Sequence, residues 1–204
     1  MQPTPLSTEV ANPDLLLGIV EARGIRQGSA DAALAAEIDT ALAKRAGVEP
    51  QPTPVSTAIR DLLRKGGYKP TGRGKPASEY LAQAAARGEW PRISHVVDAL
   101  NLVSLESGLP ISLLDTDLAM SGTTGLVVRL GRAGEKFVFN QAGHEIDVEG
   151  LISVARAEGA AIGNPVKDSM ARYFTGQPAV RNASTYFDSN AVCPPPFPTE
   201  SSSR

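Results

Sequence analysis

The two halves of this chain carry different hydrophobic patterns, and this difference is what most constrains its fold. In the first half, apolar residues recur at helical spacing, as Leu34, Ile38 and Leu42 do, between segments rich in proline and glycine. In the second half, short apolar runs are separated by glycines, which is typical of strands joined by tight turns. The sequence therefore predicts an α+β fold, with a helical first half and a small mixed or antiparallel sheet.

Cap residues and helix breakers set the limits of the expected elements. Ser29 can cap the first helix, Asp31 favours its positive end, and Gly47 ends it. In the helix that starts at position 94, we expect Ile93 and Val103 to belong to a buried apolar face, with Val96 and Leu100 between them. The expected helices are 29–47, 54–65, 77–87 and 94–107, and the expected strands are 15–25, 122–130, 136–140, 145–148, 151–155 and 180–187.

We expect a single domain with loose ends. Residues 1–12 are polar and contain proline, so they predict a flexible N-terminus, and residues 191–204 predict a tail rich in proline and serine. Residues 13–190 then form the domain. No apolar run approaches the roughly 20 residues that cross a bilayer, and the N-terminus lacks the features of a signal peptide. The default expectation is a cytoplasmic protein without a membrane partner.

The common catalytic patterns are missing from the chain. Cys193 is its one cysteine, and His95 and His144 are its two histidines, so the sequence predicts neither a Cys-based zinc site nor a multi-histidine metal site. Phosphate-binding loops and nucleophile elbows are also missing. We expect no metal and no cofactor. His95 is predicted to be a hydrogen-bonded structural residue, and His144 an exposed residue at a hairpin tip.

Three polar residues share one face of the helix that starts at position 94. Ser94, Asp98 and Asn101 follow one another at spacings of four and three residues, so they stack along the helix. Polar groups on a buried helix need partners. From spacing alone, two interpretations stay open: hydrogen bonds to the backbone of a neighbouring loop, or the polar wall of a pocket.

A second polar feature is the turn at positions 163–169, which follows the apolar residues Ala160, Ala161 and Ile162. It combines an amide, a cation, a carboxylate and a hydroxyl, and such a turn can present N–H groups and Lys167 to an anion or a carbonyl. An ordinary turn with a solvated Lys167 explains the same residues. The four polar side chains of this turn are Asn164, Lys167, Asp168 and Ser169.

Positive charge is concentrated in residues 51–95. This stretch holds eight basic and three acidic side chains, a balance of +5, whereas the rest of the chain carries −7. A basic stretch on an acidic protein can bind phosphate groups, although a solvated helix face is the plainer interpretation. The basic residues that we predict to contact RNA are Lys69, Arg73, Lys75 and Arg92.

Residues 91–115 read PRISHVVDALNLVSLESGLPISLLD. This segment resembles the amino-acid-editing module of the phenylalanyl-tRNA synthetase beta subunit, which commonly reads Arg-x-Ile-Asn-x-Val-Val-Asp-Val-Thr-Asn-Tyr-Val, then Leu-Glu-x-Gly-x-Pro. Residues 68–80 and the turn at 163–169 resemble the free-standing bacterial branch of that family. The resemblance covers about half of the chain, from about Arg60 to Ser169, and implies the α+β fold of that module.

The resemblance implies a protein that removes a wrong amino acid from tRNA by water attack, without a covalent nucleophile or a metal. It implies that Asn101 is a pocket residue. In this sequence Ser112 replaces a family histidine, and no glutamate stands near Gly163 where the family has one. The residues predicted as catalytic are Asn101, Lys167, Asp168 and Ser169, and those predicted to bind substrate are Ser94, Asp98, Ser112 and Asn164.

The resulting hypothesis is a trans-acting hydrolase of mischarged aminoacyl-tRNA, with the aminoacylated 3′ end of tRNA as its partner and no DNA. Two alternatives stay open: a non-catalytic tRNA-binding or RNA-binding module, and a pocket for a free amino acid or related metabolite. The sequence leaves open which tRNA and amino acid are recognised, and whether the chain forms a homo-oligomer.

Overall fold

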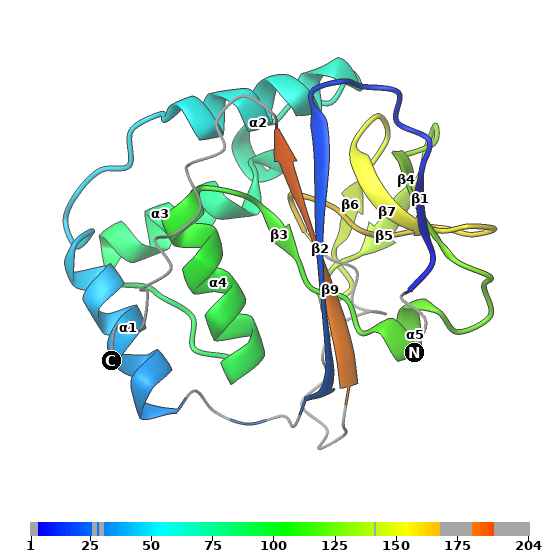
Figure 1. Ribbon diagram of the computed structural model, residues 1–204. Coiled ribbons are helices and arrows are strands. Elements are labelled where there is room, and N and C mark those ends of the chain that lie inside the picture. Colours follow the sequence, from blue (N-terminus) through cyan, green and yellow to red (C-terminus); the bar gives the residue numbers. More distant parts are fainter. Residues whose placement is uncertain (1–3, 26–27, 29–30, 141, 168–180, 190–204) are drawn as a thin grey trace, which may run out of the picture.

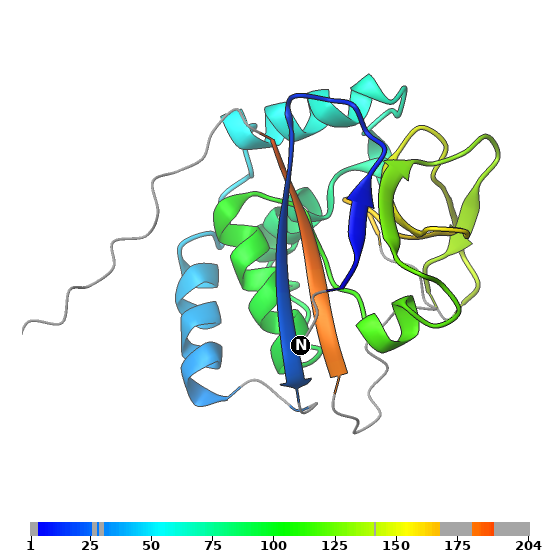
Figure 2. The same ribbon diagram turned by 45° about the vertical axis from the view of Figure 1, so that its right-hand side comes forward.

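Two strands that lie far apart in the sequence form the centre of the fold. The structure is a computed structural model, which describes residues 4–25, 28, 31–140, 142–167 and 181–189. Strand β2 (Leu15–Ile25) pairs antiparallel with β9 (Arg181–Ser189), and β9 also pairs antiparallel with the short β3 (Ile111–Ser112). Figures 1 and 2 show β2 and β9 side by side, with helices on one side and a second sheet on the other.

Three helices pack together on one side of these strands (Figure 1). They are α1 (Ala32–Ala43), α3 (Ala77–Arg87) and α4 (His95–Ser107). Ile38 of α1 is fully buried, and it clusters with Ala85 of α3 and with Leu102 and Leu105 of α4. Trp90 packs against this cluster from the connection between α3 and α4.

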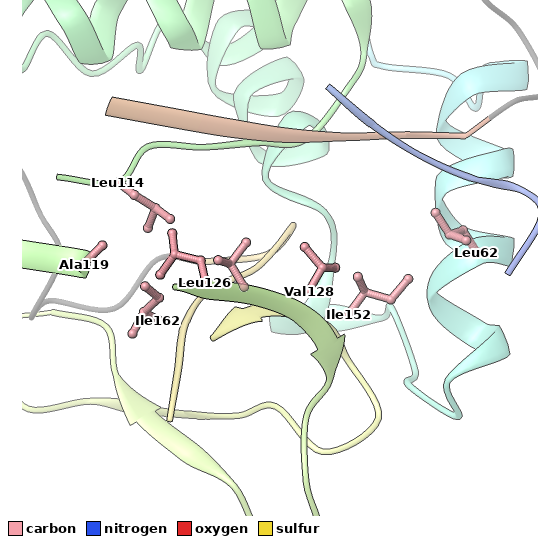
Figure 3. Close-up of a cluster of buried hydrophobic side chains, with 8 residues drawn as sticks. Leu62, Leu114, Ala119, Leu126, Val128, Ile152 and Ile162 are labelled. Carbon is pink, nitrogen blue, oxygen red and sulfur yellow. The ribbon is translucent and has the colours of Figure 1, made fainter. Parts of the chain in front are cut away.

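Helix α2 (Pro54–Lys65) packs on the side of the second sheet, where it contributes to two further apolar clusters. Thr53 accepts a hydrogen bond from the N–H of Ser56, and the Ser56 hydroxyl accepts one from the N–H of Thr53, so the helix starts with a complete capping box. Its Leu62 belongs to the cluster drawn in Figure 3, together with Val128 and Ile152. Ile59 and Leu63 pack into the third cluster.

The second sheet has the strand order β1-β4-β7-β8. Strand β1 (Leu6–Thr8) runs parallel to β4 (Leu126–Leu130), whereas β7 (Ile152–Arg156) is antiparallel to both β4 and β8 (Ala161–Gly163). Strands β5 (Lys136–Val138) and β6 (Glu145–Asp147) form a separate antiparallel pair. The short helix α5 (Thr116–Ala119) supplies Ala119 to the cluster of Figure 3.

A buried ion pair ties this sheet together. Arg129 of β4 donates two hydrogen bonds of 2.8 Å to the carboxylate of Glu135, and a third of 3.0 Å to the carbonyl of Gly159. Glu135 also accepts from the N–H groups of Arg132 and Ala161, each at 2.8 Å. The hydrogen bonds from Arg129 hold the pKa of Glu135 at about 2, well below its ordinary value.

The structure confirms the predicted α+β fold, including its helical first half and its small mixed sheet. Helices at 54–65 and 77–87 have the predicted limits, and the strand at 15–25 is also confirmed. The first helix starts after Asp31, whose carboxylate caps it, and ends before Gly47. Ser29 lies outside the described residues. The sequence analysis did not predict β1, which lies inside the segment 1–12.

The expected apolar face of α4 is only partly buried: Val96 and Leu100 are half-buried, but the other two residues are exposed. Ile93 and Val103 are 65% and 55% exposed, whereas Leu102 and Leu105 are buried. The reason is that α4 packs against α1 and α3 with the face that carries Leu102 and Leu105, and Ile93 and Val103 are not part of that apolar cluster. None of the helices in the described part of the chain has the length and apolar character to span a membrane.

Candidate functional site

Asn164 organises the tight turn that follows β8. Its side-chain oxygen accepts hydrogen bonds from the N–H groups of Val166 and Lys167, each 2.8 Å long. Its carbonyl accepts a 3.0 Å hydrogen bond from the hydroxyl of Ser112 on β3. The next carbonyl, that of Pro165, accepts a 2.8 Å hydrogen bond from the N–H of Ala77, where α3 begins. The turn is therefore held from within and by two neighbouring elements.

The side-chain nitrogen of Asn164 is buried and has no hydrogen-bond partner among the described residues. The side chain cannot be turned over to relieve this, because its other atom receives two N–H donors and must be the oxygen. A buried donor without a partner is uncommon in proteins. The turn thus carries an unused donor beside the backbone of Lys167.

The Lys167 ammonium lies between two aromatic rings. Its Nζ is 4.7 Å from the centre of the Phe139 ring and 5.3 Å from that of Tyr80. Such cation–π contacts fix the position of the amine without neutralising its charge. Among the described residues, no carboxylate forms an ion pair with Lys167. Burial lowers the pKa of Lys167, and the positive charge of Arg73 lowers it further.

The neighbouring loop is held in place by the same Tyr80. Its hydroxyl donates a 2.9 Å hydrogen bond to the carbonyl of Gly72, in the 3-10 turn η1 (Gly72–Gly74). Gly74 is needed there, because a Cβ atom at this position would lie 2.5 Å from the Tyr68 hydroxyl. This turn carries Arg73, whose side chain is exposed. The exposed Arg73 therefore lies near enough to the half-buried Lys167 for its positive charge to lower the pKa of Lys167.

The carboxylate next to Tyr80 in the sequence, that of Glu79, pairs with another residue. Glu79 precedes Tyr80 on α3, but both of its oxygens accept 2.6 Å hydrogen bonds from Arg60 of α2. The hydrogen bonds that Arg60 donates to Glu79 also raise the pKa of Arg60. The charge of Glu79 is therefore balanced by α2, and the cations at Arg73 and Lys167 keep their excess positive charge.

The predicted polar line on α4 divides into two parts. Ser94 is the N-cap of the helix, and its hydroxyl accepts a 3.4 Å hydrogen bond from the N–H of Val97. Asp98 is 3% exposed, and its carboxylate accepts a 2.9 Å hydrogen bond from the N–H of Ile93. Both side chains thus accept hydrogen bonds from backbone N–H groups at the start of α4 itself. Asn101 is half-buried, and no hydrogen bond among the described residues joins it to the turn at Asn164.

The predicted site residues therefore lie in separate places. Ser112, Asn164 and Lys167 are brought together by hydrogen bonds. Asp168 and Ser169 lie outside the described residues. His95 contacts the carbonyl of Gly28 through Nδ1 at 3.0 Å, which is the structural role expected for it, and His144 is exposed at a hairpin end, as predicted.

The predicted RNA-contacting residues also divide. Lys69 and Arg73 are exposed on the loop beside Lys167, and Lys75 on the same loop is half-buried. Arg92 instead pairs with Asp39 of α1 at 2.5 Å. The sequence analysis did not identify Tyr80 and Phe139 as site residues. They come from α3 and from the end of β5, and no spacing in the sequence relates them.

Other features lie apart from these residues. A shallow hollow of about 360 Å³ lies between α1 and α4, where Glu37, Lys44, Leu102 and Glu106 line it, and none of the predicted site residues is among its lining residues. In the part of the chain that the structure describes, no group of three or more His, Cys, Asp or Glu side chains is placed to hold a metal ion.

Comparison with known proteins gives one result for this region. The chain matches no curated protein. A family model does match, and its range contains the loop at 68–76, α3, α4 and the strands from β3 to β8, and it ends one residue before Lys167. Residues 67–166 match the B3/4 domain, the domain family found in the phenylalanyl-tRNA synthetase beta subunit.

Proposed function

We propose that this protein binds the 3′ end of aminoacylated tRNA and hydrolyses the ester of a mischarged amino acid, acting apart from the synthetase. Two findings support the proposal. Residues 67–166 match a domain family found in a tRNA synthetase subunit. Beside that segment lies Lys167, a half-buried cation that no described carboxylate neutralises. An RNA end, which is polyanionic, suits such a site.

The position of Lys167 is the observation that carries the proposal. A lysine that only improves solubility is exposed and free to move, whereas this one is held between Tyr80 and Phe139. Holding a cation there has a cost, because burial and Arg73 both lower its pKa. A negatively charged ligand would offset that cost. The site therefore has the charge and the rigidity that binding an anionic end requires.

The reaction itself needs few groups from the protein. A water molecule adds to the ester carbonyl, the bond from that carbon to the ribose oxygen breaks, and the products are the free amino acid and a 3′ hydroxyl on the tRNA. Positioning of the ester and water can supply much of the acceleration. Asn101 is the residue that we propose to orient the ester. Ser112 supports the Asn164 turn through its 3.0 Å hydrogen bond.

The test is the loss of the ester over time with a panel of correctly and incorrectly charged tRNAs, starting with tyrosine on phenylalanine tRNA. We expect faster ester loss than in buffer, and a fall to the buffer rate in Asn101→Ala. Lys44→Ala, which removes an exposed cation at the end of α1, is the matched control and should keep full activity. Ester loss at the buffer rate with every substrate would overturn the hydrolase proposal.

The exposure of Lys69 and Arg73 favours one further candidate, an RNA-binding module without catalysis. Retained binding of tRNA in the absence of hydrolysis would identify it. Because each phosphate contact releases counter-ions, that binding should weaken steeply as salt is raised. Binding that is insensitive to salt would exclude both RNA functions, and a rise in melting temperature with free amino acids would then indicate a small-molecule site.

A further inference from the structure

The two unpaired cations beside the Asn164 turn indicate which part of an RNA end this site holds. Lys167 is fixed by rings at 4.7 and 5.3 Å, and its backbone N–H is fixed by Asn164 at 2.8 Å. Arg73 is exposed on the adjacent turn, and among the described residues neither side chain forms an ion pair. Like charges near each other repel, so a full negative charge bound between Arg73 and Lys167 would stabilise both.

The ester of an aminoacyl-tRNA does not carry that charge. Its carbonyl is neutral in the bound substrate, and the amino group next to it is often protonated, which a lysine would repel. The phosphodiester next to the terminal nucleotide carries one full negative charge, with oxygens that can accept hydrogen bonds from both an ammonium and a guanidinium. Of the groups at an RNA end, the phosphodiester therefore matches these two cations best.

The residues around the two cations favour binding of an anion from outside the protein over an ion pair within it. Glu79, on the same helix as Tyr80, is engaged by Arg60 through two 2.6 Å hydrogen bonds, so it does not compete for the cations. The rings of Tyr80 and Phe139 flank the half-buried lysine, and partial removal from water strengthens its attraction for an anion. The Tyr80 hydroxyl holds the Gly72 carbonyl at 2.9 Å and so fixes the turn that presents Arg73.

We propose that Arg73 and Lys167 together bind the phosphodiester next to the 3′-terminal nucleotide, so that an RNA end without an amino acid is itself a ligand of this protein. The inference rests on the proposed function, from which it takes RNA as the ligand. It assigns Lys167 to binding the RNA and places the ester beyond it, nearer to other groups. It follows that deacylated tRNA, the product, competes with the charged substrate.

The test measures the binding of a 5′-labelled trinucleotide of sequence CCA to the full chain by fluorescence anisotropy. A second trinucleotide carries a methylphosphonate at its last linkage, which removes the charge of that group and keeps the sugar and the base. We expect the neutral linkage to weaken binding to the wild type about tenfold. In Lys167→Met, which keeps an apolar chain between the rings, both trinucleotides should bind equally weakly.

Equal binding of the two trinucleotides to Lys167→Met is the decisive result, because non-additivity shows that the lysine and that phosphate interact. Arg73→Gln should show the same loss of discrimination, and its salt dependence should fall by about 0.7 in the slope of log K against log salt for one lost single-strand phosphate contact. Lys44→Gln should retain the full discrimination of the wild type. Urea unfolding of each variant shows whether it is folded.

Two results would overturn the inference. One is a wild type that binds both trinucleotides equally tightly. The other is a folded Lys167→Met that still discriminates between them about tenfold. The ester-loss assay separates this inference from the proposed function. If the protein discriminates between the trinucleotides but does not hydrolyse the ester, the phosphate site stands and the hydrolase proposal falls. If it hydrolyses the ester but does not discriminate, the hydrolase proposal stands and the phosphate site falls.

Discussion

At the scale of single residues, the site depends on Asn164, whose side chain makes its hydrogen bonds through its oxygen alone among the described residues. Its oxygen receives two N–H groups, and its nitrogen, which is buried, receives none. Ser112 supports the same residue from β3 through a 3.0 Å hydrogen bond to the carbonyl. The residue that the resemblance compares with a family histidine thus contacts the turn that positions Lys167.

Replacing Asn164 tests whether the side-chain oxygen stabilises the turn and the side-chain nitrogen does not. Asn164→Ala removes both acceptor contacts and should lower the free energy of unfolding by about 2 kcal/mol. Asn164→Asp keeps an oxygen acceptor and removes the nitrogen that has no partner, so it should lose less stability than Asn164→Ala. Urea denaturation of both variants at neutral pH measures the difference. An aspartate variant less stable than the alanine variant would contradict the assignment of the two atoms.

At the scale of elements, Glu135 links strands β4 and β8, which do not pair with each other, through hydrogen bonds of its side chain. It contacts Arg129 of β4, the N–H of Arg132 in the following turn, and the N–H of Ala161 in β8. Its side chain is 12% exposed and that of Arg129 is 4% exposed. Removing one partner from such a pair leaves an uncompensated buried charge, which is strongly destabilising.

The pH dependence of stability follows from this pair. The pKa of Glu135 is about 2 in the folded protein against an ordinary 4.5. Because the folded value is the lower one, its contribution of roughly 3 kcal/mol is complete above the unfolded pKa and is lost as pH falls through the folded pKa. The free energy of unfolding should therefore fall between about pH 5 and pH 2.

Glu135→Gln should remove most of that fall and should lower stability at pH 7 by about 3 kcal/mol. Urea denaturation at a series of pH values measures both effects. Glu106→Gln, which changes an exposed carboxylate on α4, is the control, and it should differ from the wild type by less than about 0.5 kcal/mol. A Glu135→Gln variant with the acid sensitivity of the wild type would contradict the argument.

Local signals were enough to predict most elements. Thr53, Pro54 and the paired glycines at 66–67 gave the limits of α2, because caps and breakers act over a few residues. The buried face of α4 was predicted only in part, since apolar residues surround this helix and its packing against α1 and α3 decides which of them are covered. Strand β1 was missed because three residues with one partner strand carry too little pattern.

The candidate site was only partly predictable for a related reason. Lys167 and Asn164 were found because they lie in one short polar turn. Tyr80 and Phe139 were missed, because the contact between them and Lys167 joins three elements that no periodicity relates. The sequence also could not show that Arg92 lies apart from the other basic residues, since it pairs with Asp39, 53 positions away in the sequence.

At the scale of the whole molecule, the pairing of β2 with β9 closes the chain on itself. The register runs from Leu15 opposite Ser189 to Ile25 opposite Arg181, with irregularities in between. Strand β9 also pairs with β3, so it lies between an early strand and a middle one. The late segment is therefore part of the body of the fold.

Truncation from the C-terminal end tests this arrangement. Deleting residues 181–204 removes the strand between β2 and β3, and we expect loss of the cooperative thermal transition. Deleting only residues 191–204, the predicted tail, should leave the melting temperature within about 2 °C of the full chain. Circular dichroism during heating compares the two. A cooperative transition that survives the longer deletion would show that β2 and β3 do not depend on β9.

The same pairing has a consequence for how the chain is made. Strand β2 (Leu15–Ile25) leaves the ribosome well before β9 (Arg181–Ser189), because more than 150 residues separate them. At the usual speed of synthesis, of about 5 to 20 residues per second, β2 waits roughly 8 to 30 seconds for its partner. During that wait Leu16, Ile19 and Val20, which are about half exposed even in the finished fold, lie on a strand without its neighbour. The newborn chain should therefore be a good client for a chaperone that binds extended apolar segments, until β9 emerges.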